Sequence, residues 1–388
     1  MENSFAYLLL LTFFAVCAFQ YEMTEDADKK ERVVWLCMAV FFVFFGFRGY
    51  VYTDWTHYVV GFEYAEWSDF FDMSLLEDDD KEKITEPGFM LFLRLCKTIC
   101  DNYTFFTVAC TAVNMALLLR FVKSRNVENV PFIMMVFIAF WGLNLMFDLM
   151  RNTTAILIFA NSLQYIEQRK PVPYFLMCLA ALSFHLSSFI FFPLYFVAHL
   201  RINRWVFLGV FLGVFVFFLT HQSLIQILLK VSGLEGSYGI LLEEYTEIYS
   251  SGRPFSIYIT AEHFGLVTLV VLYYDDIIER FKGRVILLNM LLLYFIMFYI
   301  LSDFYILSLR MSTLFVFAYW VLWYDVIKVL AVRRNKWALS SVLYLYCMFL
   351  LAVNNKGPVY QYDNVLFGAK SYEERLATFR TTFKDIGI

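Results

Sequence analysis

Long apolar runs separated by short polar connections dominate this chain from end to end. We expect helices at the twelve apolar runs 4–21, 33–48, 103–122, 131–149, 152–168, 173–185, 186–200, 205–221, 257–278, 285–302, 311–330 and 337–353. A complete bilayer crossing takes about 20 apolar residues, so the shorter runs are expected to tilt or to use aromatic residues at their ends. The pattern predicts an all-α, polytopic membrane protein with about 12 transmembrane helices.

One further segment is apolar enough to touch a membrane but carries two charges. EPGFMLFLRLCKTIC, residues 86–100, contains Arg94 and Lys97, and counting it as a span would invert every later loop. We therefore predict an interfacial or re-entrant helix inside an outer segment, 49–102. An amphipathic outer loop at 222–256 and an outer tail at 354–388 complete a single integral membrane domain over residues 1–388.

Composition supports a membrane protein and excludes other classes. Hydrophobic residues make up 61% of the 388, charged residues only 17%, and mean hydropathy is +0.62, whereas soluble domains are about half apolar and a quarter charged. The net charge of −4 comes without any basic block, which argues against nucleic acid as a partner. Most of the seven cysteines lie inside apolar runs without a CxxC pair, as is typical of small buried hydrophobes.

Basic clusters set the expected orientation, because cytoplasmic loops carry an excess of Lys and Arg. The six clusters are Lys29/Lys30/Arg32, Arg120/Lys123/Arg125, Arg169/Lys170, Arg201/Arg204, Arg280/Lys282/Arg284 and Lys328/Arg333/Arg334/Lys336. All six fit on the cytoplasmic side, which places both chain ends outside. The N-terminus lacks the basic region of a signal peptide, so residues 4–21 are expected to be a retained helix.

Four ionisable residues stand at the predicted outer ends of helices, where positive-inside topology should leave few arginines. They are Arg48, Arg151, His185 and Arg310. An arginine at a helix end can simply extend to lipid headgroups. Three together favour a second interpretation, in which their planar forks grip an anionic, phosphate-bearing ligand at the outer leaflet.

The stretch FRGYVYTDWTHY, residues 47–58, adds acid–base chemistry to this surface. Asp54 and Tyr58 are four residues apart and share a face on a helix, and Glu86 returns a second carboxylate to the same surface. A carboxylate or imidazole beside phosphate-binding arginines can deprotonate an acceptor hydroxyl while a lipid diphosphate departs as the leaving group. The alternative for Asp54 is structural, as a helix N-cap or a salt bridge to Arg48.

His185 lies at a turn that we expect to be sunken below the outer surface. The preceding run PYFLMCLAALSFH spans about 20 Å at 1.5 Å per residue, which is short of a bilayer core of about 30 Å. Ser187 and Ser188 can satisfy backbone groups at that turn, and Ser188 is also a candidate for substrate binding. The alternative for His185 is a packing histidine with satisfied hydrogen bonds.

Five stretches occur in order along the chain: FRGYVYTDWTHYVVGFE, TEPGFMLFLRL, the stretch from FDLMRNTTAILIF to SFHLSSFIFFPLYF, LRMSTLFVFAYW and GPVYQY. As an ordered set, they resemble the EpsG family of bacterial polysaccharide-assembly proteins, related to Wzy-type polymerases. Asp54-Trp55 stands where the family tends to have an Asp-Tyr pair, and the acidic insert at 72–83 is peculiar to this chain.

The resemblance implies a GT-C-like glycosyltransferase of the bacterial inner membrane with its active site facing the periplasm. It would join oligosaccharide units linked to a polyprenyl diphosphate, such as undecaprenyl diphosphate, into capsule, O-antigen or exopolysaccharide. The reaction would need no metal or other cofactor. The expected partners are the lipid-linked oligosaccharides, membrane lipids, a chain-length regulator and a flippase. The two best Asp-x-Asp sequences, at 26–28 and 78–80, are not expected to bind metal.

On this interpretation each candidate residue has an expected role. Arg48, Arg151 and Arg310 would bind diphosphates, and Tyr58, Tyr360 and Tyr362 would contact sugars. The general base would be His185, Asp54 or Glu86. Three rival functions remain: a lipid-linked glycan flippase or transporter, a polysaccharide ligase that differs only in its acceptor, and a membrane O-acetyltransferase. A flippase should carry charged or broken helices through the midplane, often in repeated halves.

Overall fold

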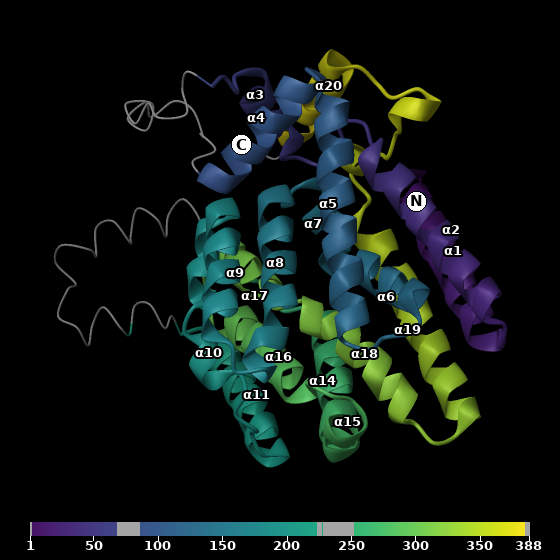
Figure 1. The fold of residues 1–388 in the computed structure, drawn as a ribbon, viewed down its shortest axis with the longest axis vertical. Helices are drawn as coiled ribbons and strands as arrows, with labels where there is room; N and C mark the ends of the chain where they lie inside the picture. The colour runs from purple at the N-terminus through teal and green to yellow at the C-terminus, as the bar shows by residue number, and fades with distance from the viewer. Residues whose placement is uncertain (1, 68–85, 223–226, 228–251, 385–388) are drawn as a thin grey trace. The chain divides into compact units, whose positions relative to one another are not determined.

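The computed structural model describes residues 2–67, 86–222, 227 and 252–384, and all regular structure in these ranges is helical (Figure 1). An isolated bridge between Arg48 and Asn364 is the nearest approach to a strand there. The all-α prediction is therefore confirmed for the described part of the chain. The acidic insert at 72–83, with Asp78–Asp80, and nearly all of the loop 222–256 lie outside the described residues.

The chain divides into two compact units, Met1–Phe192 with Val332–Ile388, and Pro193–Ala331. The first unit contains α1 (Phe5–Met23), α2 (Ala27–Gly46), α3 (Trp55–Glu63), α4 (Pro87–Ile99), α5 (Tyr103–Ser124), α6 (Val130–Phe137), η4 (Ile138–Gly142), α7 (Leu143–Phe147), α8 (Met150–Glu167), α9 (Pro171–Phe184), η5 (Leu186–Phe191), α19 (Arg333–Asn354), η6 (Pro358–Tyr360), η7 (Val365–Phe367) and α20 (Tyr372–Lys384). The second contains α10 (Leu194–Val197), α11 (Arg204–Leu219), α14 (Ile257–Leu272), α15 (Tyr274–Arg280), α16 (Arg284–Ile300), α17 (Tyr305–Thr313) and α18 (Phe317–Val329).

Helix positions follow the predicted apolar runs closely, but the number of crossings does not reach twelve. Among the described residues, four helices are long and apolar enough to span a membrane: α1, α5, α19 and the stretch Val130–Phe147. The pairs α14–α15 and α17–α18 each add a span if a bent pair is counted as one, which gives up to six. The chain is thus a membrane protein with several spanning helices, and the count of twelve is not confirmed.

Four runs predicted as simple spans are interrupted. The runs 257–278 and 311–330 are bent by 66° and 61° between their two helices, and 131–149 is broken where Trp141 takes a φ of +72°. Residues 186–200 form the 3-10 helix η5 and the four-residue α10. Between these lies Pro193, which has no N–H to donate to the carbonyl one turn back and so stops a continuous helix.

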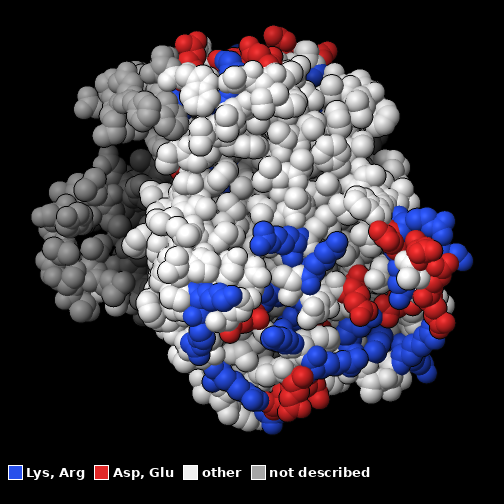
Figure 2. Space-filling view, in the orientation of Figure 1, with Lys and Arg blue, Asp and Glu red and all other residues white. Residues whose placement is uncertain are grey.

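In the first unit, contacts between residues far apart in the sequence fix both ends of the helices. At one end, Asn3 and Ser4 donate to the carbonyls of Lys356 and Asn355, at 2.8 and 2.7 Å, which ties the N-terminus to the residues after α19. At the other end, Arg125 pairs with Glu167. Along α5, Figure 2 shows an uncharged surface with Lys and Arg gathered at this second end.

The predicted interfacial segment forms α4, which packs with α3 and α5 at the first of these ends (Figure 1). Phe89, Leu93 and Cys96 are buried on one face of α4, while Leu91, Leu95 and Ile99 are exposed. Arg94 and Lys97 donate to the carbonyls of Glu66 and Glu63, just beyond and at the end of α3. The two charged side chains that argue against a span therefore donate hydrogen bonds to backbone carbonyls at and just after the C-terminal end of α3.

Candidate functional site

The turn before α3 is fixed by a carboxylate that the sequence analysis did not select. Asp148 follows α7, and its Oδ1 accepts from the backbone N–H groups of Thr53 and Asp54 at 2.8 and 2.9 Å. Its Oδ2 accepts from the Thr53 hydroxyl at 3.1 Å. Burial, and then the nearby charge of Asp54, raise the pKa of the Asp148 carboxyl to about 7. A group that titrates near neutral pH beside a second carboxylate is a candidate for proton transfer.

Backbone strain marks the same turn. Tyr52 has a φ of +73°, a conformation that is costly for a residue with a bulky side chain. Its N–H donates to the carbonyl of Val359 at 3.0 Å and its ring stacks on Phe147 at 4.9 Å between centroids. These contacts hold the turn in a shape that presents Asp54 at the start of α3.

Asp54 directly precedes α3, and Tyr58 lies one turn further along, where its backbone N–H donates to the Asp54 carbonyl at 3.1 Å. Asp54 stands at the N-cap position, but its side chain makes no capping hydrogen bond to α3 among the described residues. The geometry therefore does not support the structural role of a helix cap for Asp54. The Tyr58 hydroxyl donates to the carbonyl of Asp148 at 2.7 Å, and the residue is only 3% exposed. Burial raises the pKa of the Tyr58 phenol, which keeps it a neutral donor.

Arg151 and Glu86 meet across a long sequence separation. Arg151, in the first turn of α8, places Nη1 2.7 Å from Oε2 of Glu86, the residue that precedes α4. The Arg151 guanidinium also lies 6.0 Å from the centre of the Tyr58 ring. The Arg151 side chain is 30% exposed and that of Glu86 is 11% exposed. Part of the Arg151 guanidinium group therefore faces outward, while the Glu86 carboxylate fixes its orientation.

His185 lies at the same end of the unit. Helices α8 and α9 form an antiparallel hairpin, which brings the end of α9 back to the start of α8. Gly88 on α4 packs against Ser183, where an added Cβ would lie 2.3 Å from the serine Oγ. Helix α9 spans 14 residues, and His185 follows it as the C-cap residue. Nδ1 of that histidine lies 2.6 Å from the Ser187 hydroxyl. Ser188 is fully buried, and within the described part of the chain its hydroxyl has no hydrogen-bond partner.

Arg48 is buried rather than presented to solvent. It is 6% exposed, and its guanidinium donates to the carbonyl of Phe45 and to the sulfur of Met150, both at 2.7 Å. The group also lies 5.5 Å from the centre of the Phe147 ring. In this arrangement Arg48 links α2 to the start of α8, and its predicted contact with a diphosphate would require these bonds to be exchanged.

The C-terminal tail is laid across this end of the unit. Val365 and Gly49 donate to the carbonyls of Phe47 and Asp363, at 2.8 and 3.1 Å. Tyr362 stacks on Phe44 with ring centres 4.0 Å apart and donates to its carbonyl, while Tyr360 meets Tyr52 edge to face. Both tyrosines, predicted to contact sugars, therefore hold the tail in place.

Arg310 belongs to the second unit, in the last turn of α17, where its side chain is exposed. The structure brings together Asp54, Tyr58, Glu86 and Arg151 at one end of the first unit, with His185 and Ser188 at the same end. Asp148 was missed because its partners are more than ninety residues away; the only local signal was its position three residues before Arg151 in FDLMRN. Buried Asn152, whose side-chain amide atoms have no hydrogen-bond partner among the described residues, was missed as well.

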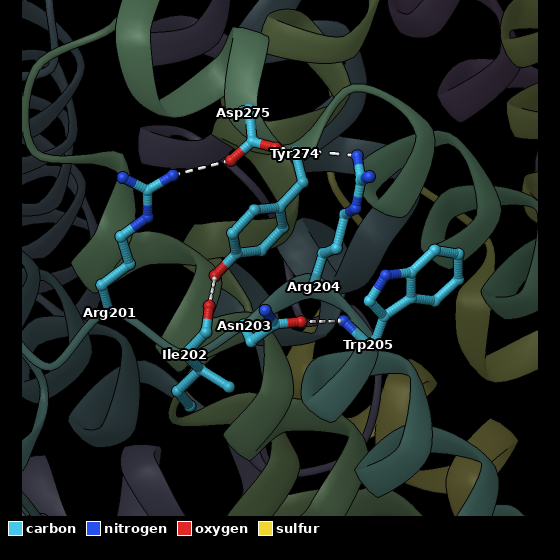
Figure 3. A pocket seen from close by; sticks show the side chains of 7 residues that line it. All are labelled: Arg201, Ile202, Asn203, Arg204, Trp205, Tyr274 and Asp275. Carbon is cyan, nitrogen blue, oxygen red and sulfur yellow. Dashed lines mark hydrogen bonds and ion pairs between the residues drawn. The ribbon is translucent and has the colours of Figure 1, made fainter.

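A cavity of about 430 Å³ lies elsewhere, in the second unit. Figure 3 shows Asp275 between Arg201 and Arg204, at 2.6 and 3.6 Å, with Tyr274 donating to the carbonyl of Ile202. These arginines belong to a predicted cytoplasmic cluster, and Asp275 offsets part of their charge. Among the residues that the structure describes, no cluster of His, Cys, Asp and Glu is able to hold a metal ion.

Comparison with known proteins identifies the family. A model of the EpsG family, a family of Wzy-like polymerases, matches residues 32–364 and so covers most of the chain. No curated protein and no solved structure matches the chain. The matched range includes every candidate site residue named above, from Arg48 to Tyr362. The chain is a member of the EpsG family.

Proposed function

We propose that this protein is a polymerase that joins polyprenyl-diphosphate-linked oligosaccharide repeat units into a surface polysaccharide at the periplasmic face of the bacterial inner membrane. Membership of a polymerase-type family and a membrane body with several apolar spans support the proposal. The single observation that carries it is the partly exposed Arg151–Glu86 pair, 2.7 Å apart, beside Tyr58 and the Asp54–Asp148 turn.

The proposed reaction exchanges one bond to the anomeric carbon for another. The bond between the donor sugar and its lipid diphosphate breaks, and a hydroxyl of the acceptor unit forms the new glycosidic bond. Arg151 binds the diphosphate oxygens as their charge develops, and Glu86 orients the fork. Asp54 or His185 takes the acceptor's proton. The reaction proposed here is GT-C-like and uses no metal.

A second candidate, a transporter of the same lipid-linked units, is favoured by one observation. The stretch Val130–Phe147 breaks near its middle, at Phe140 and Trp141, and broken helices often form transporter sites. This stretch contains no charged residue, however, so the break offers nothing to hold a diphosphate. The polymerase remains the better supported function.

Deletion of the gene and sizing of the polyprenyl-linked glycans test the proposal. We expect single repeat units to accumulate outside and long polymer to disappear, with both restored by the wild-type chain. Units that accumulate on the cytoplasmic side would establish a flippase, and long polymer that stays on its lipid carrier would establish a ligase.

Arg151 then tests the site itself. Arg151→Ala removes the cation and is expected to lower polymer output about 100-fold or more, the usual effect of losing one transition-state donor. Arg120→Ala is the matched control, because Arg120 is exposed near the opposite end of the same unit. Normal output and chain length with Arg151→Ala, at wild-type protein levels, would refute the diphosphate role.

A further inference from the structure

The second unit holds a buried acid and imidazole inside a membrane helix. Glu262 and His263 are adjacent on α14, and their side chains are 7% and 2% exposed. Ionisable groups within membrane helices are costly, and they usually face a partner or a cavity and carry function. The sequence TAEHFG places this Glu-His pair inside an apolar run, which is itself unusual.

Tyrosines from two other helices hold this pair. The Tyr319 hydroxyl, on α18, donates to Oε1 of Glu262. Nδ1 of His263 lies 2.8 Å from the hydroxyl of Tyr299 on α16, and its Nε2 lies 3.9 Å from Oε2 of Glu262. Three helices therefore fix one carboxylate and one imidazole in a defined mutual position.

A cation borders the same cluster. Arg253 precedes α14, and its guanidinium carbon lies 3.5 Å from the centre of the Phe298 ring and 5.3 Å from that of Tyr305. The His263 ring meets the same Phe298 ring at 4.6 Å between centres. The arginine and the acid–imidazole pair therefore share one aromatic wall.

Arg253 keeps hydrogen-bonding capacity that the described residues do not use. Its backbone N–H donates to the carbonyl of Ser302 at 2.7 Å, but Nε and Nη2 are buried and have no hydrogen-bond partner among the residues that the structure describes. Buried donors without partners are costly, most of all on charged groups. A guanidinium stacked on a ring with free N–H groups is well suited to phosphate oxygens, and aromatic walls with a carboxylate suit the faces and hydroxyls of a sugar.

We propose that the second unit contains a second substrate site, in which Arg253 binds a phosphate of one lipid-linked glycan and the Glu262–His263 pair binds a hydroxyl of its sugar. This inference rests on the proposed function, because that reaction takes two lipid-diphosphate-linked molecules. Arg151 in the first unit serves one of them, and Arg253 serves the other.

Binding of a sugar-free polyprenyl diphosphate tests the phosphate contact directly. The purified full-length protein is titrated with this lipid in detergent, and binding is followed by native mass spectrometry. Arg253→Met is expected to weaken binding at least tenfold, and Arg253→Lys less, because lysine keeps the charge without the fork. Arg280→Met is the control, since Arg280 lies beyond the opposite end of α14 and donates to the carbonyl of Lys328.

Two outcomes of this titration would overturn the phosphate contact. One is equal binding by the wild type and Arg253→Met. The other is an equal loss of phosphatidylglycerol binding in the same variant, which would assign Arg253 to ordinary lipid headgroups.

Glu262→Gln tests the sugar contact and separates this inference from the proposed function. The variant keeps its shape and is expected to bind the sugar-free lipid normally. It should lose at least tenfold in affinity for the sugar-bearing unit and in polymer output, whereas wild-type affinity for that unit would overturn the sugar contact. If the wild-type gene restores polymer while Glu262→Gln and Arg253→Met also give polymer of normal yield and length, the second site is wrong and the polymerase stands. If the wild-type gene restores no polymer, the polymerase fails, and the binding data alone decide the second site.

Discussion

Replacing Asp148 with Asn should make the protein more stable at neutral and alkaline pH. The carboxylate accepts from the N–H groups of Thr53 and Asp54 through Oδ1, and from the Thr53 hydroxyl through Oδ2. An asparagine in the same position keeps the carbonyl oxygen for both N–H groups. Its amide can donate to the Thr53 hydroxyl, which also accepts hydrogen bonds. Asp148→Asn therefore removes the charge and preserves the contacts.

The size of the effect follows from the raised pKa of Asp148. Its ordinary pKa is 3.8, and burial together with Asp54 raises it to about 7, even though the three hydrogen bonds act in the opposite direction. The folded chain therefore binds this proton more tightly than the unfolded chain, so ionisation lowers the free energy of unfolding. The loss is absent below about pH 4, grows as the pH rises, and is complete above about pH 7. Three pKa units at about 1.36 kcal/mol each correspond to about 4 kcal/mol.

Thermal unfolding of the detergent-solubilised protein from pH 4.5 to 8 measures this effect. The wild type should lose stability across the range, whereas Asp148→Asn should lose much less and exceed the wild type at pH 8 by about 1–4 kcal/mol. Asp101→Asn is the control, because Asp101 is an exposed carboxyl in the connection between α4 and α5. An unchanged pH slope, or a less stable Asp148→Asn at pH 8, would show that its donors keep the carboxylate ionised and that the reasoning is wrong.

Two further predictions concern packing. Arg284 and Asp325 form a fully buried ion pair with contacts of 2.6 and 2.9 Å. Arg284→Met alone should therefore cost about 3–5 kcal/mol of unfolding free energy, and adding Asp325→Leu should recover most of that loss. Equal losses in the single and double variants, measured by unfolding in detergent, would contradict this. Gly88→Ala places a Cβ 2.3 Å from the Oγ of Ser183. This overpacking should cost about 1–3 kcal/mol of unfolding free energy in the same assay. Adding Ser183→Ala should restore part of that stability, because it removes the crowded hydroxyl.

Hydrophobic periodicity was enough to predict most of the helices but few of their interruptions. The runs 103–122 and 337–353 agree with α5 and α19 to within a few residues at each end. Apolar length cannot show where a helix bends, because a bend depends on which neighbours receive the freed backbone groups. This is why 257–278 and 311–330 were predicted as single spans.

The candidate site was predictable to the extent that charge is unusual in an apolar chain. Arg151 and Glu86 were each predicted as site residues on the same outer surface. The sequence could not show that they form an ion pair across 65 positions. Arg48 looked equivalent to Arg151, although it is buried against Phe45 and Met150. Asp148 escaped notice because its role depends on backbone N–H groups, which every residue carries and no motif reveals.

The tail that crosses the first unit has a consequence for biosynthesis. The turn from Phe47 to Tyr52 exchanges backbone hydrogen bonds with residues 359–365, which the ribosome adds some 300 positions later. Until then, the N–H groups of Gly49 and Tyr52 lack their final acceptors, and Tyr52 lacks a bond that holds its strained φ. All helices from α1 to α19 are therefore synthesised before this surface can be completed. We therefore expect the proposed polymerase activity to depend on residues 359–365, and a chain truncated after residue 358 should enter the membrane without polymerising glycans.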